Sequence, residues 1–355
     1  MFFAWGGIVS TQDVSVIITV KNEEMTVIPL LESLVSQTRQ PDEVIIVDGG
    51  STDRTISNIK TFAQKCSVPI RLIIRPGYNI SQGRNEAIKA AKGPIIASTD
   101  AGVKLSPDWL AALTAPFERD SQIPVVSGWF IPAPQTEFET AMGATVLPEL
   151  SEIDPEKFIP SSRSVAFRKE AWRKVGGYPE WLDYCEDIIF DLRLRDLYGS
   201  FPFATDAVAY FRPRSTLLSF WRQYFRYARG DGKADLWRAH HIVRYLAYLI
   251  AVLLLVMSLL HSPWLLGLLL AGATLYLWAP YRRLRSILKA SPKAHLGAIF
   301  LIPIIRLIGD SAKMVGYPIG LIWRYRHRTQ NEIYWRKHLR SKLGSTSPGP
   351  SRWFF

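Results

Sequence analysis

Hydrophobic residues in the first two thirds of the chain form short β-branched runs that alternate with stretches of helical periodicity. The runs that predict strands are Val14–Thr19, Glu43–Asp48, Ile70–Ile74 and Ile95–Thr99. The stretches between them predict helices at residues 24–36, 52–65 and 81–91. A strand about every 25–30 residues with a helix in between is typical of βαβ units, so the pattern predicts an α/β fold with a parallel sheet.

The last third has a different pattern, because Tyr245–Tyr281 form 37 consecutive residues without Asp, Glu, Lys or Arg. One membrane-spanning helix needs about 20 apolar residues. The stretch therefore predicts a transmembrane hairpin with helices at about residues 243–260 and 264–281 and a turn at Ser262-Pro263. A buried helix pair in a soluble protein is the alternative, but soluble helices rarely lack a charged outer face over this length.

A third apolar segment, Leu296–Trp323, is interrupted by Arg306, Asp310 and Lys313, whose spacing puts them on one helix face. Two interpretations stay open: an amphipathic helix at the membrane interface, or a third span whose charged stripe packs on the hairpin. A third span would export the basic tail, residues 324–355, against the tendency of basic residues to stay cytoplasmic. The interfacial interpretation is therefore favoured, with a disordered end to the tail.

The net charge of +12 is confined to this last third. Residues 1–240 hold 27 Lys and Arg against 29 Asp and Glu, a balance of −2, whereas residues 241–355 hold 16 against 2, a balance of +14. Because the basic residues flank apolar segments, they favour a membrane surface over a nucleic acid as partner. The expected organisation is a cytoplasmic domain at 1–240, a membrane region at 241–323 and the tail.

Acidic residues follow three of the four predicted strands. Glu23, Asp48 and Asp100 come where the strands end, and ligands of parallel sheets bind at the carboxyl ends of strands. Neither a G-x-G-x-x-G after the first strand nor a P-loop motif is present, so dinucleotide and P-loop binding lose their main support. Taken alone, Asp48-Gly49-Gly50-Ser51 is explained equally well as a strand-to-helix turn, and Asp100 as a turn residue.

Four motifs in order change that balance. They are Val16–Glu24, Val44–Thr55, Gly83–Ala87 with Asp100 after it, and Gly176–Pro179 followed by Glu186-Asp187. Together they resemble family 2 glycosyltransferases over about residues 13–230. The resemblance implies a GT-A fold, which is a Rossmann-like mixed sheet that binds nucleotide-diphospho-sugars. It also implies a nucleotide-sugar donor and inversion at the anomeric carbon.

The same resemblance implies roles for individual residues. Asp48 would hold the nucleobase, and Arg84 would lie near the donor phosphates. The remaining residues implied to line the donor pocket are Thr19, Lys21, Asn22, Glu23 and Asp100. Asp187 would act as the general base, with Glu186 as its acidic neighbour. Favourable placement of acids in the first turn of a helix is the alternative explanation of that pair.

The sequence departs from the family where a metal would bind. The family usually has Asp-x-Asp there, but this chain has Asp100-Ala101-Gly102. Mg²⁺ or Mn²⁺ is still expected at Asp100, because Mg²⁺ takes few protein ligands and keeps several waters. The alternative is that Arg212 and Arg214 partly replace the metal, since Arg is suited to phosphate.

Trp221–Tyr227 resembles the Gln-x-x-Arg-Trp motif of membrane-bound polysaccharide synthases, with Gln223 and Arg226 matching and Tyr227 in the place of the Trp. The resemblance implies that the aromatic ring stacks on the acceptor sugar and that the Arg binds the diphosphate. A basic amphipathic helix lying on the membrane surface is an equal alternative.

The expected protein is a bacterial inner-membrane glycosyltransferase of the hexosyltransferase type, with its catalytic domain in the cytoplasm. It would add single sugars to a lipid-linked or glycan acceptor during cell-surface polysaccharide or glycolipid synthesis. A processive synthase and a catalytically lapsed, membrane-tethered nucleotide-sugar binder are the alternatives. Its expected partners are the donor, the acceptor and membrane lipids, and no nucleic acid.

Overall fold

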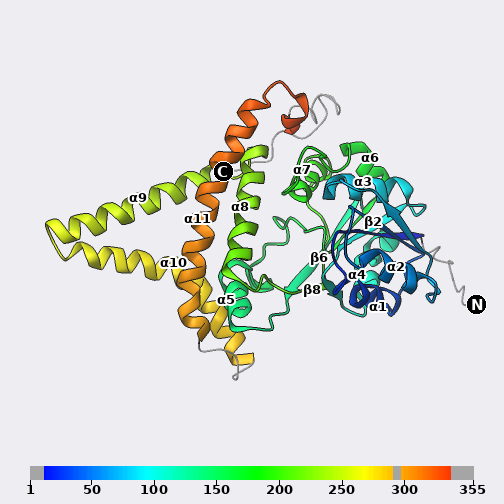
Figure 1. Cartoon of the computed structure of the whole chain (residues 1–355), viewed down its shortest axis with the longest axis horizontal. Coiled ribbons are helices and arrows are strands. Elements are labelled where there is room, and N and C mark those ends of the chain that lie inside the picture. Colours follow the sequence, from blue (N-terminus) through cyan, green and yellow to red (C-terminus); the bar gives the residue numbers. More distant parts are fainter. Residues whose placement is uncertain (1–11, 291–296, 337–355) are drawn as a thin grey trace, which may run out of the picture. The chain divides into compact units, whose positions relative to one another are not determined.

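The computed structural model describes residues 12–290 and 297–336, which fold as two compact units (Figure 1). Unit 1 contains the described residues up to Ile131 together with Pro155–Phe211. Unit 2 contains Pro132–Asp154 together with the described residues from Arg212 onward. The end of the basic tail that the sequence predicts to be disordered, beyond Gly344, lies outside the described residues.

Unit 1 is an α/β unit built on one mixed sheet, with the strand order β3-β2-β1-β4-β7-β6-β8-β5 in the described residues. The strands are β1 (Val14–Val20), β2 (Glu43–Asp48), β3 (Ile70–Ile74), β4 (Ile95–Asp100), β5 (Val103–Leu105), β6 (Val125–Pro132), β7 (Val165–Arg168) and β8 (Phe203–Phe211). The helices are α1 (Val27–Val35), α2 (Thr55–Ala63), α3 (Ile80–Ala90), α4 (Trp109–Arg119), α6 (Lys169–Val175) and α7 (Glu186–Tyr198). The four predicted strands and their parallel pairing are confirmed.

Both faces of the sheet are covered by helices, as its central strand requires. Val16 and Ile18 of β1 belong to one hydrophobic cluster with residues of α1, α2 and α4. Ile17, which points to the opposite face, belongs to a second cluster with residues of α3, α6 and α7. Figure 1 shows the two helix layers on either side of the strands. A buried central strand reads as a continuous apolar run, which is why β1 was visible in the sequence.

Unit 2 is helical in its described residues. Its elements are α5 (Glu137–Val146), η1 (Leu150–Glu152), α8 (Leu217–Ala234), α9 (Arg238–Leu260), α10 (Leu265–Ala290), α11 (Gly297–Arg326) and η2 (Asn331–Ile333). Helices α8 and α11 approach closely where α11 carries glycine. A Cβ atom at Gly316 would lie 2.3 Å from the Phe225 carbonyl oxygen, and one at Gly320 would lie 2.2 Å from that of Arg229. The glycines therefore allow the two backbones to touch.

Helices α9 and α10 form the predicted helical pair and are joined by a turn at His261–Trp264. Helix α10 runs on to Ala290, nine residues past the predicted end at 281, because Arg282–Ala290 is also a good helical sequence. Among the described helices, only α9 is long and apolar enough to cross a membrane. The predicted pair of helices is thus present, whereas a pair of membrane spans is not established.

Candidate functional site

Three strand ends bring predicted donor-binding residues to one rim of the unit 1 sheet. Strand β1 lies between β2 and β4, and the register aligns Thr19 with Asp100 and Val20 with Asp48. Residues that are 28 and 81 positions apart in the chain are therefore neighbours across the strands. Ligands of parallel sheets bind at such a rim. The expectation that Thr19, Asp48 and Asp100 share one edge is met by the strand register.

Asp48 builds the turn that follows β2. Its carboxylate is fully buried, and its Oδ1 accepts hydrogen bonds from the backbone N–H groups of Gly50 and Ser51, each at 2.8 Å. Gly50 has a φ of +93°, which favours glycine. These contacts match the strand-to-helix turn that explains the motif without a ligand. The assignment of Asp48 to a nucleobase stays a prediction.

The loop after β1 is locked onto the loop after β2. Asn22 has a φ of +57°, its Oδ1 accepts from the Thr52 N–H at 2.9 Å, and its own N–H donates to the Ser51 hydroxyl at 2.8 Å. Lys21 beside it is exposed, and Glu23 is half-buried and bound by the hydroxyl of Thr26. Lys21 is therefore a charged side chain of this loop that a ligand can reach.

Helix α3 carries the Gly83–Ala87 motif and holds the Gly176–Pro179 motif in place. The Asn85 side chain receives the N–H of Tyr178 at 2.9 Å and donates to the Tyr178 carbonyl at 2.9 Å. Gly177 has a φ of +73°, and a Cβ there would lie 2.8 Å from the Asn85 Oδ1. Two motifs more than 90 residues apart are thus one structural element, in which glycine is required by both conformation and space.

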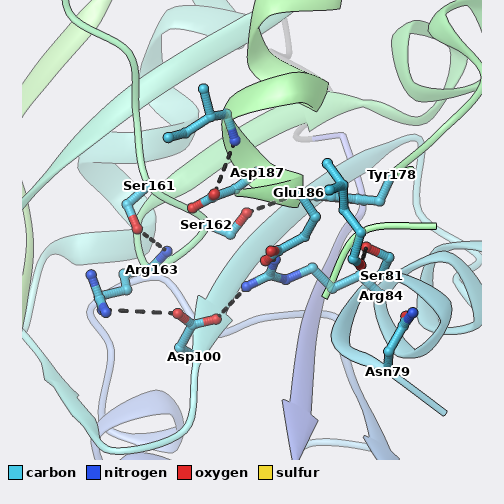
Figure 2. A network of polar contacts seen from close by, with 12 residues as sticks. Asn79, Ser81, Arg84, Asp100, Ser161, Ser162, Arg163, Tyr178, Glu186 and Asp187 are labelled. Carbon is cyan, nitrogen blue, oxygen red and sulfur yellow. Dashed lines mark hydrogen bonds and ion pairs between the residues drawn. The ribbon is translucent and has the colours of Figure 1, made fainter. Parts of the chain in front are cut away.

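Arg84, one residue earlier on α3, joins two of the predicted acids (Figure 2). Its Nη1 lies 2.6 Å from Glu186 Oε1, and its Nη2 lies 2.7 Å from Asp100 Oδ1. The side chain is only 3% exposed. Burial opposes the charge of Arg84, but the carboxylates of Asp100 and Glu186 outweigh it and raise the pKa of the guanidinium. Arg84 is therefore a buried bridge between the sheet rim and α7.

The place near the donor phosphates that the resemblance implies for Arg84 stays a prediction. Both of its terminal nitrogens already bind carboxylates, and its Nε is buried without a hydrogen-bond partner. A guanidinium with this burial acts on the site through Asp100 and Glu186.

The first turn of α7 concentrates negative charge. Glu186 is buried and Asp187 is partly exposed beside it. Burial, followed by the neighbouring Asp187, raises the pKa of Glu186 to about 7, although Arg84 opposes the shift. Cys185, just before the pair, has a φ of +65°, a conformation uncommon for residues other than glycine. The chain thus turns sharply to present the two acids, and Asp187 is the accessible one.

Asp191 is a third acid of this group that sequence analysis missed. It is 2% exposed, and its Oδ2 has no hydrogen-bond partner. Burial and the charges of Asp187 and Glu186 raise its pKa. Its position one helical turn after Asp187 was the available signal, because residues four apart share a helix face.

Arg163 is the second missed residue, and nothing in the sequence around it marked it. Its Nε lies 3.8 Å from Asp100 Oδ2, on the side of that carboxylate away from Arg84 (Figure 2). Its guanidinium also covers the ring of Phe211 at 4.8 Å. Asp100 is therefore held between two cations at the rim.

The expected metal has little protein support at this position. The described residues contain no group of three His, Cys, Asp or Glu side chains that could hold a metal ion. Gly102 stands where the family's second Asp would be, and each oxygen of Asp100 faces a guanidinium. These donors do not fit a metal site built by the protein itself.

The remaining candidates lie in unit 2. Arg212 pairs with the buried Glu139 at 2.8 Å, and Arg214 is exposed. Within α8, the Gln223 Nε2 donates to the Tyr227 hydroxyl at 2.7 Å, so two residues of the Gln-x-x-Arg-aromatic pattern contact each other. Arg226 stands between them in the same helix. Their predicted roles toward acceptor and diphosphate stay predictions.

Comparison with known proteins identifies unit 1. Residues 15–175 match the model of glycosyl transferase family 2. Over this region the chain is similar to glycosyl transferase family 2. The match ends before α7, so the grouping of Glu186, Asp187 and Asp191 rests on the geometry of this chain alone.

Relatives of the glycosyltransferase domain include two curated enzymes. A dodecaprenyl-phosphate galacturonate synthase from Rhizobium johnstonii is 26% identical over 125 residues, covering 34% of this chain and 37% of that one. An undecaprenyl-phosphate 4-deoxy-4-formamido-L-arabinose transferase from Pectobacterium carotovorum is 33% identical over 109 residues, covering 29% of this chain and 32% of that one. The chain thus spans about a third of the length of these curated relatives.

A solved mannosyltransferase from Pyrobaculum calidifontis, in complex with GDP-Man and Mn²⁺, shares the fold. It aligns with a TM-score of 0.51 at 18% identity and covers 90% of both chains. At this identity the likeness establishes the GT-A-like fold of the glycosyltransferase domain.

Proposed function

We propose that the protein is an inverting glycosyltransferase that moves a sugar from a nucleotide-sugar donor to a lipid-linked acceptor at the cytoplasmic face of a bacterial inner membrane. The observation that carries the proposal is the Arg84 bridge, which ties Asp100 at the donor rim to Glu186 beside Asp187. A donor rim and a general base must lie together for a single displacement. The names of the two curated relatives contain a polyprenyl phosphate, which supports a lipid-linked acceptor.

In this reaction an acceptor hydroxyl oxygen forms a bond to the anomeric carbon, while the bond from that carbon to the diphosphate oxygen breaks. Asp187 takes the hydroxyl proton, and the nucleoside diphosphate leaves with the bonding electrons. General-base catalysis of this kind contributes about 10²–10⁴-fold. Glu186 and Arg84 are positioning residues that hold the start of α7 against the rim.

Thr19, Lys21, Asn22, Glu23 and Asp48 are proposed to surround the nucleotide. Exposed Lys21 supports this role, since a cation at the rim attracts a diphosphate. Arg163 is proposed to stabilise the departing diphosphate through Arg–phosphate hydrogen bonds. The proposed reaction has no step that depends on a divalent cation such as the Mn²⁺ of the Pyrobaculum calidifontis complex.

The membrane location rests on unit 2. Leu259, Trp264 and Leu275 of the α9–α10 hairpin are 77%, 89% and 77% exposed. Apolar side chains exposed in such number mark a surface that contacts lipid or another protein. We propose that the hairpin inserts in the bilayer, that α11 lies at the interface, and that residues 1–240 and 324–355 stay in the cytoplasm.

A topology experiment tests this placement. A reporter fused after Gln330 or after Arg238 is expected to report a cytoplasmic location, because both ends of a hairpin face the same side of the membrane. A reporter inserted at Ser262 is the matched control and is expected to report the opposite side. A periplasmic signal from the Gln330 fusion would make α11 a third span.

The raised pKa of Glu186 gives a test in pH. A carboxyl whose pKa is higher in the folded protein contributes stability below its unfolded pKa of 4.5, and this stability is lost as the pH rises through about 7. Relative to Glu186→Gln, the wild type should therefore lose about 1–3 kcal/mol of unfolding free energy between about pH 4 and pH 8. Urea unfolding across this range measures it, with Glu118→Gln as the exposed-site control. Parallel curves for wild type and Glu186→Gln would contradict the shift.

A donor screen tests the function directly. The purified full chain in detergent is incubated with a panel of nucleotide sugars and a polyprenyl-phosphate-linked acceptor, with and without Mg²⁺ or Mn²⁺. Transfer from one donor is expected, with inverted anomeric configuration by NMR. A protein that binds a donor but neither transfers nor hydrolyses it would be the lapsed binder.

A further inference from the structure

A charged cluster lies inside unit 2 where α9 and α10 meet α11, at the base of the apolar hairpin. Figure 1 shows the hairpin projecting from α11, with its turn at the far end. We call Arg244 of α9 and Arg306, Asp310 and Lys313 of α11 the hairpin-base cluster. The three α11 residues are the charged stripe seen in the sequence, and the reaction proposed above does not use them.

Asp310 is fully engaged within the cluster. It is 2% exposed, its Oδ1 lies 2.9 Å from Arg244 Nε, and its Oδ2 accepts the Tyr248 hydroxyl at 3.0 Å and the Tyr276 hydroxyl. One cation and two hydroxyls therefore satisfy this buried carboxylate. Asp310 is the single carboxylate of the hairpin-base cluster, which also holds the three cations Arg244, Arg306 and Lys313.

Arg306 and Lys313 have no carboxylate within salt-bridge distance in the part of the chain that the structure describes. They are held by aromatic rings instead, since Arg306 lies 4.3 Å from the Tyr276 ring and Lys313 lies 5.0 Å from the Tyr224 ring. The Arg306 Nε is buried without a hydrogen-bond partner. Arg244 and Arg306 repel the Lys313 ammonium, whereas Asp310 and Asp231 attract it.

The carboxylate of Asp231 does not compensate the positive charge of the hairpin-base cluster. Asp231 of α8 acts on Lys313, but its Oδ2 lies 3.2 Å from the His241 ring nitrogen. The other ring nitrogen of His241 faces Arg244 at 3.1 Å. Cations outnumber carboxylates around this point, in a layer of apolar helices where unpaired charge is costly.

An anion bound between these helices would accept hydrogen bonds from Arg306 and Lys313. The base of a membrane hairpin lies at the level of lipid headgroups, where basic side chains between helices bind phosphate. We propose that the hairpin-base cluster binds the phosphate group of the lipid-linked acceptor, with Arg306 and Lys313 as its main donors. The identity of the lipid as acceptor rests on the proposed function, whereas binding of a lipid phosphate here does not.

The test is a binding measurement on the full chain in phosphatidylcholine nanodiscs. A polyprenyl monophosphate is titrated in, and binding is followed by native mass spectrometry. Arg306→Gln/Lys313→Gln is expected to weaken binding about tenfold or more, because each basic side chain near a lipid surface contributes about 1 kcal/mol. The control Arg326→Gln/Arg328→Gln removes the same charge from the end of α11 and is expected to bind as the wild type does.

Equal losses in the two double variants would overturn the proposal, because they would indicate general charge attraction. Competition by phosphatidylglycerol as strong as by the polyprenyl phosphate would overturn the choice of acceptor phosphate, as would equal binding of inorganic phosphate. Should the double variant not fold by circular dichroism, Lys313→Gln alone is measured, with a loss of about fivefold expected. Donor hydrolysis, measured in parallel, reports on the proposed function separately.

Discussion

Replacing Asp187 by Asn should lower kcat for sugar transfer by about 10²–10⁴-fold while leaving the affinity for the donor nearly unchanged. The amide keeps the size of the side chain but does not take the proton of the acceptor hydroxyl. Asp187 is the partly exposed acid of its group, and the buried Glu186 beside it is already bound to Arg84. Initial rates and calorimetric titration of the nucleoside diphosphate give the two quantities.

Asp206→Asn is the control for this variant. Asp206 is an exposed carboxylate on β8, so the same chemical change there should leave kcat within about twofold of the wild type. Near-normal turnover by Asp187→Asn would remove Asp187 as the base. An equal loss of kcat and of donor binding would instead give Asp187 a binding role.

Arg84→Met should reduce the free energy of unfolding by about 3–5 kcal/mol and abolish measurable transfer. The change leaves Asp100 and the buried Glu186 without their shared cation, and an unpaired buried charge is strongly destabilising. Arg84→Lys keeps the charge, but an ammonium lacks the planar fork that reaches two carboxylates at once. It should therefore recover part of the stability and little of the activity.

Arg75→Gln is the matched control, because Arg75 and Glu86 form an exposed pair at 2.7 Å. Exposed pairs contribute about 0–1 kcal/mol, so this variant should unfold within that range of the wild type. Chemical denaturation of the three variants decides the matter. A loss below about 1 kcal/mol in Arg84→Met would show that the bridge does not support the site.

The strands and the acidic rim were predictable because they are local patterns. A central strand buried on both faces needs an apolar run, and β1 and β2 have one. The ends of such strands must meet at one edge, so Asp48 and Asp100 were placed on the same rim by the strand pattern alone. Helices α9, α10 and α11 were predictable for a similar reason, since long apolar stretches have few other folds.

The destinations of buried polar side chains were not predictable. Arg84 contacts Glu186 across 102 positions, and Asn85 contacts Tyr178 across 93. A sequence shows that a motif is present but not which other motif its side chain reaches. Arg163 carries no motif at all, so only the fold brings it to Asp100. Apolarity likewise predicted the α9–α10 pair but does not establish that both helices cross a bilayer.

The glycine contacts between α8 and α11 place backbone directly against backbone at Gly232, Gly316 and Gly320. A Cβ at Gly232 would lie 2.3 Å from the Tyr317 carbonyl oxygen, so the spacing is set by main-chain atoms. Helices α8 and α11 therefore form one rigid element, which carries Gln223, Tyr227 and Lys313. A displacement of one helix must therefore move the other with it. A side chain in place of one of these glycines would push the two backbones apart.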